Sequence, residues 1–211
     1  YPLDAFPDYP HYSVWHDGYY LTANKNQGDK VYVLNRQAMI DGLPDPTIIG
    51  FNLPQLVRNP ATVLSPEPAN LIGNDADTDS PAFIVYLQDA AWGGVSYDHL
   101  KVWTIETDFT TPDNSTVSQP QEIETAPFDS FFRSFGLGDF KQKNTTQRLD
   151  GASGVISYAA NYRSFDNYNS WVITFNEDMG SQRGGIRWIE LRNTDADSSW
   201  ALYQEGSYAP E

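Results

Sequence analysis

Oxygen-bearing side chains recur at every second position in the segment NDADTD, residues 74–79. Three of them, Asp75, Asp77 and Asp79, carry the hard carboxylate oxygens that Ca²⁺ prefers, at the spacing found at the start of calcium-binding loops. The segment lacks the Gly at the sixth position and the Glu at the twelfth position of such a loop. We therefore expect a solvated turn rich in Asp and Asn, with Ca²⁺ binding by these three residues as the alternative.

The other residue types that carry chemistry are sparse. The three histidines, His11, His16 and His99, show no spacing that would place two of them together on a helix as metal ligands. Cysteine is absent, which excludes disulfides, thiolate metal sites and a Cys nucleophile. No Gly-x-Ser-x-Gly motif is present for a nucleophilic serine. These observations favour a protein without a catalytic centre.

Aromatic residues beside the connections between predicted strands are candidates for stacking on sugar rings. Trp92 is the strongest, because Gly93 and Gly94 follow it and would leave the indole uncovered. Tyr97 and Tyr168 occupy comparable positions, and Tyr162 and Trp171 lie close to a connection as well. The alternative is that these rings pack the interior, which is the common role of Trp and Tyr in all-β proteins.

The charge of the chain limits its partners. Thirteen Lys and Arg against 28 Asp and Glu give a formal net charge of −15. A surface of this sign repels phosphate backbones, so we expect neither nucleic acid nor an anionic membrane as a partner. No apolar run approaches the roughly 20 residues needed to span a bilayer, and membrane insertion is not expected.

The elements that must position these residues are strands. Aromatic residues make up 14% of the chain, and similar apolar-aromatic phrases recur at 31–36, 100–105 and 186–191. Each phrase belongs to a unit of three or four predicted antiparallel strands, at about 9–53, 82–124 and 155–208. Such repetition is typical of a β-propeller. Because a ring needs about four to eight blades, residues 1–211 are expected to form one partial propeller of about three blades, completed by another chain or segment. The alternative is a self-contained sandwich or open three-blade body.

The first strands resemble the first blade of the five-bladed propeller glycoside hydrolases. The resemblance covers about 20 residues, Asp8-Tyr9-Pro10 followed by HDGYYL at 16–21. It implies that Asp8 would be a general base. A second carboxyl group about 5–10 Å away would have to serve as the acid, and only elimination suggests Glu190 or Asp98. Glu190 lies between Ile189 and Leu191 on a predicted strand, where an outward solvated carboxylate is the simpler expectation.

A longer resemblance covers nearly the whole chain. The phrases YPHYSVWHDGYYLTAN (9–24), VYVLNR (31–36), GIRWIELR (185–192) and WALYQEGSYAP (200–210) are similar to a propeller-like region of large secreted bacterial surface proteins, some of them cargo of the type IX secretion system. The resemblance implies an extracellular or cell-surface location and transfers no catalytic residues. We predict a non-catalytic module for binding or scaffolding, with a glycan or protein ligand and a role in adhesion, and a propeller glycoside hydrolase as the alternative.

Overall fold

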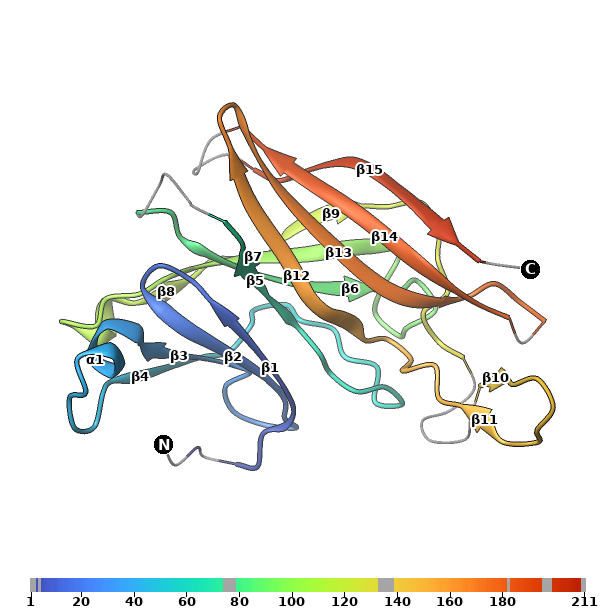
Figure 1. Ribbon diagram of the computed structural model, residues 1–211, viewed down its shortest axis with the longest axis horizontal. Coiled ribbons are helices and arrows are strands. Elements are labelled where there is room, and N and C mark those ends of the chain that lie inside the picture. Colours follow the sequence, from blue (N-terminus) through green and yellow to red (C-terminus); the bar gives the residue numbers. More distant parts are fainter. Residues whose placement is uncertain are drawn as a thin grey trace.

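The computed structural model describes residue 3 and residues 5–73, 79–132, 139–181, 183–194 and 199–209. Within these residues the chain is all-β, as predicted, with one short helix, α1 (Arg36–Ile40), and one 3-10 turn, η1 (Pro112–Asn114). Figure 1 shows the arrangement of the strands. The strands are β1 (Asp8–Val14), β2 (Gly18–Asn24), β3 (Val31–Asn35), β4 (Ile48–Phe51), β5 (Glu67–Leu71), β6 (Ala82–Gln88), β7 (His99–Glu106), β8 (Thr116–Val117), β9 (Gln121–Glu124), β10 (Phe140–Lys141), β11 (Arg148–Leu149), β12 (Ile156–Phe165), β13 (Tyr168–Asp178), β14 (Gly184–Asn193) and β15 (Ala201–Tyr208).

The N-terminal sheet follows chain order. Strands β1 to β4 pair with their sequence neighbours in an antiparallel meander, which occupies the first predicted unit. Helix α1 lies between β3 and β4, and the Asn35 side chain caps it by accepting a hydrogen bond from the Ala38 amide at 3.0 Å. Strands β2 and β3 are buried on both faces: Tyr20, Val31 and Val33 lie on one face, and Leu21 and Tyr32, each 5% exposed, lie on the other.

The second sheet is long and strongly curled (Figure 1). Its order is β15-β14-β13-β12-β5-β6-β7-β8, and β9 also pairs with β7. Strands β5 and β12 pair in parallel and join the second and third predicted units into one sheet. Separate propeller blades would not share such a ladder, so this junction departs from the predicted arrangement. Strand β5 comes from the segment between the first two predicted units, where no strand was predicted.

A cluster of aromatic rings lies between the two sheets. Tyr162 and Trp171 point to one face of the curled sheet, where Phe83 and Trp200 join them. Trp15, which follows β1, brings the N-terminal sheet into contact, with its ring centroid 4.8 Å from that of Tyr162. Its indole N–H donates to the Ser80 carbonyl at 3.0 Å. Tyr162 and Trp171, which are 2% and 0% exposed, thus pack the interior, as the alternative to stacking at a surface predicted.

A polar contact also joins the two sheets. The His11 ring on β1 donates from Nδ1 to the carboxylate of Glu67 on β5, and the Ser65 hydroxyl lies 3.3 Å from the same nitrogen. Glu67 is fully buried, and its Oε1 has no hydrogen-bond partner among the described residues. Burial raises the pKa of Glu67, and the hydrogen bond and charge of His11 offset only part of that rise.

Replacing Glu67 with Gln should stabilise the protein increasingly as pH rises. The folded-state pKa of Glu67 is raised above its ordinary value of 4.5, so its contribution is most favourable below pH 4.5 and is lost as pH rises through the folded-state pKa. Gln does not titrate and still accepts the hydrogen bond from His11. Urea unfolding of the native protein and of Glu67→Gln between pH 4 and 8 measures the gap between their free energies of unfolding. Glu106→Gln on the exposed end of β7 controls for net charge, and a gap that is constant or shrinks with pH contradicts the prediction.

Candidate functional site

The structure buries the strongest predicted ligand residue. Trp92 is 3% exposed, so the expectation that its glycines leave it uncovered is wrong. Its ring packs 5.9 Å from that of Tyr86. A distant segment also packs against it, since a Cβ added at Gly154 would lie 3.0 Å from the Trp92 ring. Trp92 is thus a packing residue in the described part of the chain.

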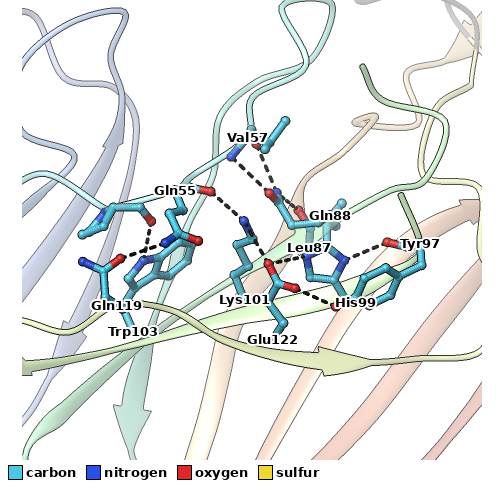
Figure 2. Close-up of polar contacts among 11 residues, drawn as sticks. Gln55, Val57, Leu87, Gln88, Tyr97, His99, Lys101, Trp103, Gln119 and Glu122 are labelled. Atoms are coloured by element: carbon cyan, nitrogen blue, oxygen red, sulfur yellow. Dashed lines mark hydrogen bonds and ion pairs between the residues drawn. The ribbon is translucent and has the colours of Figure 1, made fainter. Parts of the chain in front are cut away.

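Tyr97 stays at the surface, 38% exposed, above a network of polar side chains on β7 and β9. Figure 2 shows Lys101 and Glu122 facing each other beneath the loop that carries Gln55. The Tyr97 hydroxyl donates to Glu122 at 2.6 Å, and Lys101 donates to the Gln55 carbonyl at 2.6 Å and lies 3.3 Å from Glu122. The His99 ring lies under Tyr97 and donates from Nδ1 to the Tyr97 carbonyl at 2.7 Å.

The hydrogen bonds of this network shift the pKa values of two of its members. The hydrogen bond from Tyr97, followed by the contacts of Lys101 and His99, lowers the pKa of Glu122, although burial opposes the change. The same hydrogen bond raises the pKa of Tyr97. A carboxylate held ionised in this way is a poor proton donor. The network therefore fixes the Tyr97 ring in place and favours the ionised form of Glu122.

Asp8 lies in a cleft of about 710 Å³ at the N-terminal sheet. It is exposed and accepts a hydrogen bond from the Asn24 side chain at 2.9 Å. Among the described residues that line this cleft, Asp8 is the sole carboxylate; the lining is Ala5, Phe6, Asp8, Asn24, Lys25, Asn26, Gln27 and Gly28. The cleft thus brings no second described carboxyl group to Asp8.

The two acids named by elimination are engaged in local contacts. Asp98 accepts from the Ala90 amide at 2.6 Å and from the Phe128 amide at 3.1 Å, which orders the connection around it. Glu190 is 8% exposed rather than the solvated carboxylate expected on that strand. Burial alone would raise the pKa of Glu190, but hydrogen bonds led by that of Arg192 outweigh burial and lower it. Neither residue is placed as a general acid.

Of the three predicted calcium ligands, only Asp79 lies among the described residues. Asp75 and Asp77 lie outside the described residues, and Asp79 is exposed next to them. In the part of the chain that the structure describes, no group of three or more His, Cys, Asp or Glu residues is arranged to hold a metal ion.

Tyr168 belongs to a row of two arginines and three aromatic rings at one end of the curled sheet. Arg192 lies between two tyrosines, with its guanidinium carbon 4.2 Å from the Tyr168 ring centroid and 3.4 Å from that of Tyr203. Phe165 stacks on the other side of Tyr168 at 4.8 Å, and the Arg163 guanidinium lies 5.1 Å from Phe165. We call these five residues, which come from β12, β13, β14 and β15, the aromatic–arginine strip.

The strip lies on the sheet face opposite the buried aromatic cluster. Tyr168 and Ser170 alternate with the buried Trp171, and Ser170 pairs with Arg192 across the ladder, so these polar and aromatic side chains share the outer face. Phe165 is 41% exposed and Tyr203 is 56% exposed. Neighbouring strands hold the rings at fixed spacing, which is the rigidity that a binding surface needs.

Glu190 holds Arg192, the central residue of the strip, in place. Its Oε1 accepts from Arg192 Nε at 2.7 Å and from the Ser170 hydroxyl at 2.8 Å, while its Oε2 accepts from the Gln204 amide at 2.6 Å. The hydrogen bond to Glu190 also raises the pKa of Arg192. The guanidinium is thus fixed in orientation before any ligand arrives.

A β-bulge brings Tyr203 to this face. Leu202 pairs with Leu191 and Gln204 pairs with Glu190, so Tyr203 is one extra residue on β15. Regular alternation would place Tyr203 and Gln204 on opposite faces, and the bulge turns both toward Arg192 and Glu190. The sequence contains no residue that signals this bulge, which is why Tyr168 was predicted as a ligand residue whereas Arg192 and Tyr203 were missed.

The strip combines aromatic rings with a guanidinium held in a fixed orientation. Phe165 and Tyr203 offer exposed apolar ring surface, and the guanidinium offers N–H donors at a fixed position. No helix in the described ranges has the length and apolar character needed to cross a membrane. No family model matches the chain, and neither a curated protein nor a solved structure matches it.

Proposed function

We propose that this chain is a non-catalytic binding module of a secreted or cell-surface protein and that it holds a glycan on the aromatic–arginine strip. The observation that carries the proposal is the preorganised sandwich of Arg192 between Tyr168 and Tyr203 on an exposed sheet face. Glycans have apolar ring faces and dense hydroxyl groups, so flat aromatic rings combined with fixed polar donors suit them.

The hydrolase alternative receives no comparable support. A glycoside hydrolase needs two carboxyl groups flanking one bond. Asp8 has no carboxylate partner among the described residues of its cleft, and Glu190 is committed to Arg192, Ser170 and Gln204. The binding function therefore accounts for more of the arrangement than hydrolysis does.

Of the partial propeller, the N-terminal sheet alone stays part of the proposal, because β5 and β12 join the other two predicted units into one curled sheet. The meander of β1 to β4 has the strand order of a blade, and another chain or segment would complete the assembly as the sequence suggests. Adhesion through a glycan, or scaffolding of a protein partner, is the role that such a module would serve at a cell surface.

Removing the Tyr203 ring should weaken glycan binding about tenfold, the effect of roughly 1.4 kcal/mol of lost contact. Isothermal titration with oligosaccharides from xylan, mannan, cellulose, pectin and alginate measures the affinity of the native chain and of Tyr203→Ala. Tyr12→Ala on β1 is a matched control, because Tyr12 is 55% exposed and Tyr203 is 56% exposed. Absence of binding to the whole panel, or equal losses in the two variants, rejects the proposal.

A further inference from the structure

The edge of the Arg192 guanidinium that bears Nη1 and Nη2 is the part left for a ligand. Nε donates to Glu190 at 2.7 Å, and the Tyr168 and Tyr203 ring centroids lie 4.2 Å and 3.4 Å from the guanidinium carbon. Among the described residues, neither Nη group has a hydrogen-bond partner. The Arg192 side chain is 27% exposed, so water or a ligand reaches that edge.

A guanidinium edge presents two parallel N–H groups that match two oxygens on one atom. A carboxylate supplies such a pair and makes charge-assisted hydrogen bonds, which are roughly twice as strong as those to neutral acceptors. The negative charge of Glu190 lies behind the guanidinium, where Ser170 and Gln204 also donate to it. Tyr203 stands beside the open edge and offers its exposed ring to the sugar that bears the carboxylate.

We propose that the glycan bound at the strip is an acidic one, read through its uronate carboxylate by the Nη edge of Arg192. This inference rests on the proposed glycan-binding function and names the chemical class of the ligand. The net charge of −15 repels any acidic polymer at long range. A local receptor such as Arg192, oriented and enclosed by rings, is what would let this chain bind an acidic sugar selectively in spite of that repulsion.

Matched ligands test the inference with the unmodified protein. Oligogalacturonate and oligomannuronate are titrated alongside their carboxyl methyl esters, which keep the sugar rings and remove the charge. We expect each acid form that binds to do so at least about tenfold more tightly than its ester, as one charge-assisted bidentate contact implies. Equal or tighter binding of the esters overturns the acidic-ligand inference and leaves glycan binding intact, whereas binding of no saccharide overturns both.

Two variants locate the effect. Arg192→Lys keeps the positive charge and loses the two-pronged donor, so the preference for acid over ester should fall toward equality. Arg183→Lys, a matched change at an exposed arginine outside the strip, should leave the preference unchanged. Near-ultraviolet circular dichroism confirms that each variant is folded. An undiminished preference in Arg192→Lys, or equally tight binding of polyglutamate to the native chain, contradicts recognition of a uronate by Arg192.

Discussion

Truncating Trp171 to Ala should cost the protein about 3–5 kcal/mol of its free energy of unfolding. The indole is fully buried, with ring centroids 5.4 Å from Trp200 and 6.1 Å from Phe83, and its N–H donates to the Ala160 carbonyl at 3.2 Å. The truncation leaves a large cavity in the cluster between the sheets. It also leaves the Ala160 carbonyl without this donor. Urea unfolding followed by tryptophan fluorescence measures the loss.

The next residue along β13 provides the control. Val172 points to the opposite face and is 41% exposed, so Val172→Ala should change the free energy of unfolding by less than about 1 kcal/mol. Similar losses in Trp171→Ala and Val172→Ala would mean that the aromatic cluster is not the core that joins the sheets.

Removing Arg187 should be comparably severe, at about 3–5 kcal/mol. Arg187 is 6% exposed and pairs with Glu205 across β14 and β15. It also donates to the Ala126 carbonyl at 3.2 Å, while Glu205 accepts from the Ala126 amide at 2.8 Å. In Arg187→Ala the partly buried Glu205 carboxylate loses the cation that offsets its burial. The segment at Ala126 loses one of its two hydrogen bonds to these side chains.

A double-mutant cycle distinguishes this ion pair from simple packing. The double change Arg187→Ala with Glu205→Ala should lose less stability than the sum of the two single changes, because the stranded charge is removed with its partner. Arg183→Ala, at an exposed arginine, should have almost no effect. Strict additivity of the two single changes would contradict coupling between Arg187 and Glu205.

The strands were the most predictable part of the molecule. Alternating apolar and polar residues, as in β13 and β14, mark both the strand and its buried face, and short connections make neighbouring strands antiparallel. The meanders at each end of the chain therefore follow from local patterns.

The junction of the curled sheet could not be predicted from local patterns. Strand β5 contains Pro68, which lacks an amide donor and argues against a strand in the middle of a sheet. Its partner β12 lies far along the sequence, and no short-range signal specifies that pairing. The same limit explains Trp92, since the segment at Gly154 that covers the indole is distant in the chain.

Of the three residues at the centre of the candidate site, only Tyr168 was named as a ligand residue from the sequence. Tyr168 follows a turn after a strand, so exposure could be expected from its position. Arg192 lies on a strand where its contacts depend on the neighbouring side chains, and Tyr203 depends on a bulge that alternation does not encode. A binding surface composed from adjacent strands is thus visible only once their register is known.

The parallel ladder between β5 and β12 determines when this protein can complete its folding during translation. Ala69 aligns with Ala160, a separation of 91 residues obtained as 160 minus 69. A ribosome must therefore synthesise most of the chain before β5 receives its second neighbour, and until then one edge of β5 offers unpaired amide and carbonyl groups to other nascent chains. Delayed acquisition of protease resistance during translation, with chaperone dependence over that interval, is the expected biological consequence.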